Sequence, residues 1–136
     1  IFETYKPISS SEFSNKIALL PSGYVDYLEK KYSVLNEALH LDVPIRINDF
    51  KAIEAAILKN NAFSELDQLA ILADKYYPKS MLAEYELGLM YEKQEDYKKA
   101  MKRYQNASQM QEIGALTKTM MLEKYDLMLS KNAPKK

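Results

Sequence analysis

His40 is the single histidine in the sequence, and histidine is the side chain that most often serves as a catalytic base or a metal ligand. A catalytic triad would need a serine and a carboxylate beside it, and a metal site usually needs three or four ligands. His40 and the nearby Asp42 are too few for either site. His40 follows an apolar helical pattern, and its partial positive charge suits the end of a helix. We therefore predict a surface residue, with no catalytic and no metal-binding role.

Carboxylates are the next candidates, because paired acids can perform acid–base chemistry. Glu92, Glu95 and Asp96 lie in one stretch, and Glu3 and Glu12 lie in another. Asp96 directly precedes a helical pattern and is predicted to cap that helix. The other acids stand near lysines and are typical of solvated turns and surfaces.

The composition limits which classes of function are open. The sequence has 136 residues, 47% of them hydrophobic, with 19 basic and 19 acidic side chains, no cysteine and three glycines. Balanced charge disfavours nucleic acid as a partner. Three isolated glycines cannot form a phosphate-binding loop, and we predict no cofactor. No apolar run approaches the roughly 18–20 residues that a membrane span requires. The composition does not identify the cellular compartment of the protein.

The first 46 residues are predicted to be a boundary followed by helices. Pro7 and three serines indicate that residues 1–10 are the tail of an upstream domain and a linker. Residues 11–46 are predicted to be a helical linker region. It contains a short helix that ends before Pro21 and a long helix from Ser22 to Leu39.

The stretch from Met81 to Gln109 has the spacing of two helices that cross closely. Gly88, Ala100 and Ala107 are the small residues that such a crossing requires. The pattern of small and aromatic residues resembles a tetratricopeptide repeat. Glu95 departs from it, because glycine usually makes the turn between the helices. The pattern comprises Leu87, Gly88, Tyr91, Ala100, Tyr104 and Ala107.

A shift by the period of about 34 residues aligns a weaker repeat with this one. It predicts a degenerate first repeat at residues 47–80, with Asn48 or Asp49 as its N-cap, and a second at residues 81–114. A capping helix from Ala115 to about Leu129 would close the stack. The prediction is an all-α chain, with repeats and cap at residues 47–130 and a disordered tail at residues 131–136.

The order of features also resembles the C-terminal extension of bacterial enterochelin-esterase-like α/β-hydrolases. The segments that carry this resemblance are IFETYKP at 1–7, YLEKKYSVLNEALHLDVPI at 27–45 and the repeat block at 67–107. The resemblance implies a catalytic hydrolase domain before this chain, which itself has no G-x-S-x-G nucleophile motif. It also implies that this chain is an accessory part without catalytic residues.

Stacked repeats expose the first helix of each pair on a concave surface, which is the remaining candidate site. The expected groove residues are Asn48, Lys51, Ala55, Leu58 and Lys59 from the first repeat and Leu82, Tyr85, Leu89, Glu92 and Lys93 from the second. Their mixed character favours an apolar groove that holds a helix or an adjacent domain over one that binds a peptide carboxylate. The predicted function is a non-catalytic domain that packs on or positions an upstream esterase-type hydrolase. The alternative is a free-standing adaptor that binds a peptide or helix. The oligomeric state stays open.

Overall fold

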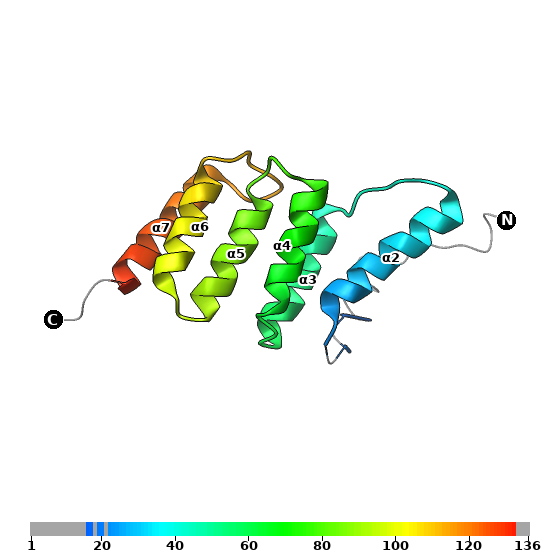
Figure 1. The fold of residues 1–136 in the computed structure, drawn as a ribbon, viewed down its shortest axis with the longest axis horizontal. Coiled ribbons are helices and arrows are strands. Elements are labelled where there is room, and N and C mark those ends of the chain that lie inside the picture. The colour runs from blue at the N-terminus through cyan, green and yellow to red at the C-terminus, as the bar shows by residue number, and fades with distance from the viewer. Residues whose placement is uncertain (1–15, 18, 21, 133–136) are drawn as a thin grey trace. The chain divides into compact units, whose positions relative to one another are not determined.

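A computed structural model describes residues 16–17, 19–20 and 22–132, and this part of the chain is all-α, as predicted (Figure 1). It contains two isolated bridges between loops and no named strand. The chain divides into two compact units, residues 1–60 and residues 61–136, called unit 1 and unit 2 below. The helices are α2 (Tyr24–Leu39), α3 (Ile47–Lys59), α4 (Glu65–Tyr76), α5 (Leu82–Lys93), α6 (Tyr97–Ser108) and α7 (Lys118–Asn132).

In unit 1, α2 follows Gly23, whose φ of 72° is accessible to glycine at little cost. The helix predicted from Ser22 to Leu39 is α2, which begins two residues later, at Tyr24. Tyr24, Leu28 and Tyr32 recur every four residues along α2 and are buried, so they form its apolar face. His40 ends the helix in a left-handed conformation, with φ 52°, and is exposed as predicted. The predicted residues 1–10 and most of the short helix before Pro21 lie outside the described residues.

The start of α3 differs from the prediction. Neither Asn48 nor Asp49 is the N-cap, because the helix begins at Ile47 and the extended Arg46 is the capping residue. The Asp49 N–H donates to the Arg46 carbonyl at 3.0 Å, which already places Asp49 within the first turn. Asp49 is only 2% exposed. Its carboxylate therefore points into the unit, where it needs polar partners.

In unit 2, helices α4 to α7 pack in chain order, each against the next (Figure 1). The turn between α5 and α6 contains Glu95 at φ 62°, the position where the repeat pattern prefers glycine. Asp96 caps α6, as predicted, by accepting a hydrogen bond from the Lys99 N–H at 3.3 Å. Consecutive packing of this kind is the arrangement of helical-repeat proteins.

The two ends of the α5–α6 hairpin are joined by backbone hydrogen bonds. The Met81 N–H donates to the Gln111 carbonyl at 2.9 Å, and the Gln111 N–H donates to the Lys79 carbonyl at 3.1 Å. After Gln111 the chain turns at Gly114, with φ 57°. Because of this turn, the last helix begins only after Gly114, at Lys118.

The last helix, α7, is displaced from its predicted range of Ala115 to about Leu129. It begins at Lys118 and continues through Asn132. The prediction of a disordered tail is therefore wrong for residues 131 and 132, which are helical, and residues 133–136 lie outside the described part.

The core of unit 2 combines small residues, one aromatic ring and methionines. Its buried members are Met81, Ala100, Tyr104, Ala107, Met121 and Met128. Unbranched methionine side chains fill the irregular space around an aromatic ring well.

None of the helices in the described ranges has the length and apolar character needed to cross a bilayer.

Candidate functional site

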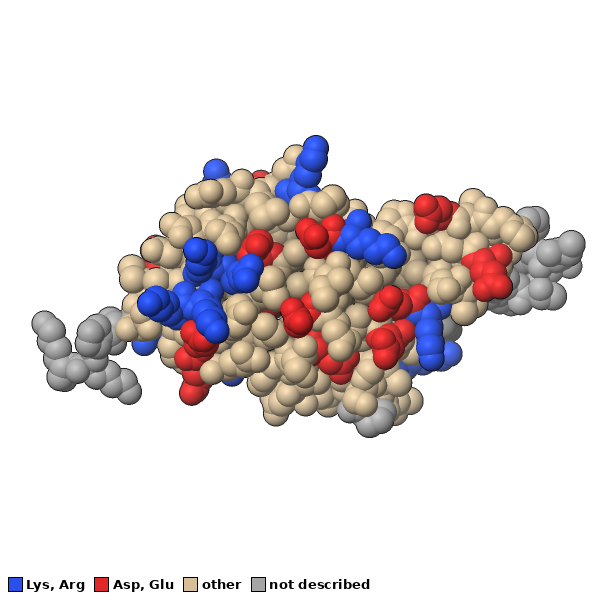
Figure 2. Space-filling view, viewed as in Figure 1, with Lys and Arg blue, Asp and Glu red and all other residues tan. Residues whose placement is uncertain are grey.

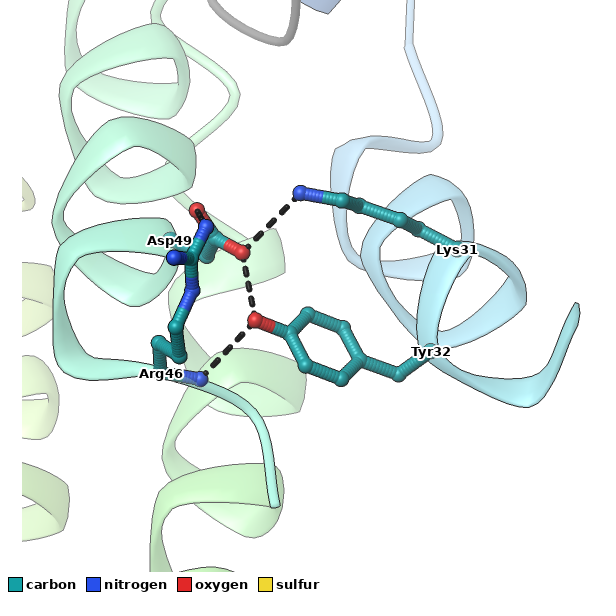
Figure 3. Close-up of polar contacts among 4 residues, drawn as sticks. All are labelled: Lys31, Tyr32, Arg46 and Asp49. Carbon is teal, nitrogen blue, oxygen red and sulfur yellow. Dashed lines mark hydrogen bonds and ion pairs between the residues drawn. The ribbon is translucent and has the colours of Figure 1, made fainter. Parts of the chain in front are cut away.

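In unit 1, the buried carboxylate of Asp49 contacts three side chains, those of Lys31, Tyr32 and Arg46 (Figure 3). Its Oδ2 accepts hydrogen bonds from the Tyr32 hydroxyl at 2.5 Å and the Lys31 ammonium at 3.1 Å. Its Oδ1 lies 3.7 Å from the Arg46 guanidinium. The Tyr32 oxygen in turn accepts from the Arg46 backbone N–H at 3.1 Å. These four residues, called the Asp49 cluster below, join α2 to the start of α3.

Burial sets the electrostatics of the Asp49 cluster. Tyr32 is 3% exposed, and burial, followed by the hydrogen bond to Asp49, raises the pKa of its phenol above the usual 10.0. The Tyr32 oxygen and then the Asp49 charge raise the pKa of the Arg46 guanidinium. The cluster thus keeps a neutral phenol beside a carboxylate and two cations. Its groups are bonded to one another, and the arrangement serves to hold two helices together.

The connector between α2 and α3 is fixed from the same face of α2. The Asn36 amide donates to the Val43 carbonyl at 3.2 Å and accepts from the Val43 N–H at 2.7 Å. The Leu41 N–H donates to the Asn36 carbonyl at 3.0 Å. Asn36 lies one helical turn after Tyr32, so consecutive turns of α2 hold the connector and the start of α3.

Unit 2 contains a second cluster, formed by Gly88, Glu92, Tyr104 and Lys124 and called the Tyr104 cluster below. A Cβ at Gly88 would lie 2.6 Å from Cε1 of Tyr104, so only glycine fits under this ring. The Tyr104 hydroxyl donates to Glu92 Oε1 at 2.7 Å. The Lys124 ammonium lies 3.5 Å from the same oxygen and 5.7 Å from the centre of the Tyr104 ring. The cluster therefore joins α5, α6 and α7 at one point.

The groove residues predicted on α3 lie at the surface of the chain or close to it. Leu58 is half-buried, while Asn48, Lys51, Ala55 and Lys59 are exposed. They carry two positive charges and a small apolar surface. Their role as a binding surface stays a prediction.

The groove residues predicted on α5 are less accessible. Leu82 and Leu89 are each 4% exposed, and Glu92 is engaged in the Tyr104 cluster. The Tyr85 ring is tilted by 48° against the Tyr104 ring at 6.3 Å between centres. Lys93 alone of the five is exposed. Because Leu89 is buried and Tyr85 contacts the Tyr104 ring, replacing these two residues would disturb the packing of α5 as well as the binding of any partner.

Helix α6 presents a basic face, and in Figure 2 Lys and Arg side chains gather over the region where Figure 1, in the same view, shows α6. The helix carries no acidic residue. Arg103 bonds Glu84 of α5 at 3.3 Å, and Lys99 lies 3.7 Å from Asp96. Both cations also lie over the Tyr91 ring, at 6.0 and 5.5 Å from its centre. The basic residues of this helix are Lys98, Lys99, Lys102 and Arg103.

The sequence did not reveal the polar contacts that form the two clusters. Tyr32 lies in the helix predicted from Ser22 to Leu39 and Asp49 is a predicted helix cap, and nothing in their spacing indicates that they meet. Gly88 and Tyr104 were expected at a helix crossing, and the structure places them in direct contact. Among the residues that the structure describes, no group of three or more His, Cys, Asp or Glu could hold a metal ion.

These features define an all-α protein whose C-terminal half packs helices consecutively, with buried polar clusters between neighbouring helices. No protein-family model matches the chain, and no curated protein matches it. A crystal structure of an uncharacterised protein from Capnocytophaga ochracea DSM 7271 is similar to it, with 31% sequence identity and a TM-score of 0.83. The similarity covers 95% of this chain and 36% of that protein's chain. The chain therefore spans little more than a third of the length of the solved structure it matches.

Proposed function

We propose that this chain is a non-catalytic accessory domain that packs on or positions the catalytic domain of an esterase-type hydrolase. The observation that carries the proposal is the coverage of the similar structure. Nearly the whole of this fold, 95%, corresponds to 36% of a longer polypeptide. That proportion suits a domain that works beside others in one chain.

The use of polar groups supports a structural role. The Asp49 cluster holds α2 to α3. The Tyr104 cluster holds α5, α6 and α7. Strongly bonded side chains of this kind rigidify a scaffold. A rigid scaffold fits a domain whose action is to present a surface and fix an orientation.

The alternative, a free-standing adaptor with a peptide groove, is less well supported. Two of the five expected groove residues on α5 are 4% exposed, and Glu92 is bonded within the fold. A peptide groove would need several of these side chains to be free for a ligand. The tetratricopeptide relation itself remains part of the proposal.

Two measurements test the proposal: the coding sequence upstream of Ile1 is read, and the purified chain is assayed for ester hydrolysis. We expect a G-x-S-x-G motif between a predicted strand and a predicted helix in that upstream sequence. We also expect purified residues 1–136 to leave acyl nitrophenol esters unhydrolysed. An upstream sequence without such a motif would exclude the esterase assignment. Ester hydrolysis by the purified chain, unchanged after further purification, would exclude the non-catalytic assignment.

A further inference from the structure

Positive charge is concentrated on one side of α6, although the chain as a whole carries 19 basic and 19 acidic side chains. The basic face of α6 consists of Lys98, Lys99, Lys102 and Arg103, and α6 has no acidic residue between them or after them. With roughly 100° per residue in an α-helix, the four side chains lie within an arc of about 140°. They therefore form one continuous basic surface.

One row of this face, formed by Lys99 and Arg103, is engaged within the fold. Lys99 lies 3.7 Å from Asp96, and Arg103 lies 3.3 Å from Glu84. Both cations also lie over the Tyr91 ring of α5, at 5.5 and 6.0 Å from its centre. These contacts fix the row against α5 and balance its charge.

The other row, formed by Lys98 and Lys102, has a different environment. Both side chains are exposed, and neither forms an ion pair with an acid in the part of the chain that the structure describes. Residues four apart are neighbours on a helix, so these like charges repel each other and destabilise α6. Folding gains nothing from this arrangement, whereas two carboxylates with the same spacing would compensate both charges.

We infer that the basic face of α6 binds an acidic helix of a separate protein, with carboxylates four residues apart opposite Lys98 and Lys102. Four residues of helix rise about 6 Å, so the two pairs of charges have the same spacing on both helices. The inference goes beyond the proposed function and does not depend on the hydrolase assignment.

The character of the face favours a reversibly bound protein. The large hydrophobic side chains of α6, Tyr97, Met101 and Tyr104, are half-buried or buried, so the face offers charge and little apolar surface. Permanent interfaces are more hydrophobic, whereas exposed charges mainly accelerate and orient encounters between separate proteins. Glu84 and Asp96 border the face and would repel the closely spaced phosphates of a nucleic acid.

The experiment titrates the complete chain, residues 1–136, into a fluorescently labelled helical peptide and follows the anisotropy. The probe is an alanine-rich peptide of about 20 residues with glutamates four residues apart, and its control has glutamine at the same positions. We expect the chain to bind the glutamate peptide more tightly, and the difference to shrink between about 0.02 and 0.3 M salt, because salt screens exposed charges.

Lys98→Gln combined with Lys102→Gln should lower the affinity for the glutamate peptide by about three- to tenfold. The matched control, Lys75→Gln combined with Lys79→Gln, removes the same charge from two exposed positions outside α6 and should change the affinity little. Lys98→Glu combined with Lys102→Glu should reverse the preference, so that a peptide with lysines at the glutamate positions binds more tightly.

Three results would overturn the inference. The first is equal affinity for the glutamate and glutamine peptides, and the second is an equal loss of affinity in the matched control. The third is tighter binding of a DNA duplex or of phosphatidylserine vesicles than of the glutamate peptide, because the face would then recognise phosphate. Circular dichroism should show that Lys98→Gln with Lys102→Gln does not lower the melting temperature, because this change removes a repulsion.

Discussion

Unit 1 and unit 2 hold their helices together by different means. Between α2 and α3, the carboxylate of Asp49 on α3 accepts hydrogen bonds from Lys31 and Tyr32 of α2, and burial makes those bonds strong. Between α5 and α6, a glycine allows an aromatic ring to lie directly on the neighbouring backbone. The first arrangement depends on the charge and hydrogen bonds of Asp49, and the second depends on the shape of Tyr104. The two units should therefore respond to different kinds of substitution.

Tyr104→Ala should have the largest effect. Tyr104 is fully buried, lies in the core cluster of unit 2 and bonds Glu92. Removing a buried aromatic ring leaves a cavity and costs about 3–5 kcal/mol of unfolding free energy. Urea unfolding followed by circular dichroism measures this loss. A loss below about 1 kcal/mol would contradict the central position of the ring.

Gly88→Ala tests the same contact, because the sign of its effect on the unfolding free energy should depend on whether Tyr104 is present. In the native background the new Cβ would lie 2.6 Å from the ring, and such overpacking typically costs about 1–3 kcal/mol. In the Tyr104→Ala background the ring is gone, and alanine should stabilise α5 by up to about 1 kcal/mol through its helix propensity. The same sign in both backgrounds would show that Gly88 and Tyr104 do not constrain each other.

Asp49→Asn should destabilise unit 1 through electrostatics with almost no change in shape. The substitution removes the charge that Lys31 and Arg46 face and weakens the bond from Tyr32. Incompletely satisfied buried groups cost about 1–3 kcal/mol. Hydrogen exchange should show faster exchange in α2 and α3, with α5 to α7 nearly unchanged. Asp26→Asn, at an exposed position of α2, is the matched control and should change little.

Raising the pH should also weaken unit 1. The folded-state pKa of Tyr32 is raised above 10.0 by burial and by Asp49, so the folded chain keeps the phenolic proton more tightly than the unfolded chain. The stability from this group is fully present below about pH 10 and declines as the pH rises toward the folded-state pKa. Tyr32→Phe should lower stability at neutral pH by about 1 kcal/mol and reduce its decline above pH 10. Tyr77, whose pKa burial also raises, provides the comparison in unit 2: Tyr77→Phe should leave the alkaline response of α2 unchanged.

The elements whose signals are local could be predicted well from the sequence. The apolar spacing of Tyr24, Leu28 and Tyr32 locates α2, and the capping carboxylate of Asp96 locates the start of α6. Small residues at Gly88 and Ala100 indicate a close helix crossing. Each of these signals depends on neighbours within a few turns of helix.

The candidate sites were less predictable because they depend on contacts between distant segments. Asp49 is acidic and stands near a helix start, which suggests a cap, yet its partners Lys31 and Tyr32 are 18 and 17 residues earlier. Leu82 and Leu89 fit an exposed groove by repeat position, but both are buried in the folded chain. Sequence spacing gives the face of a helix and leaves open what covers that face.

Glu95→Gly should have the smallest effect, and it should be stabilising. Glu95 adopts φ 62° in the turn between α5 and α6, a conformation that costs a non-glycine residue about 1–2 kcal/mol. Glycine removes that strain but increases the freedom of the unfolded chain, so the net gain should be about 0.5–1 kcal/mol. Thermal unfolding should show a correspondingly higher melting temperature. Glu95→Ala removes the same charge but keeps the Cβ, and it should give no gain. An equal gain from alanine would trace the effect to the charge of Glu95 and separate it from the backbone conformation of the turn.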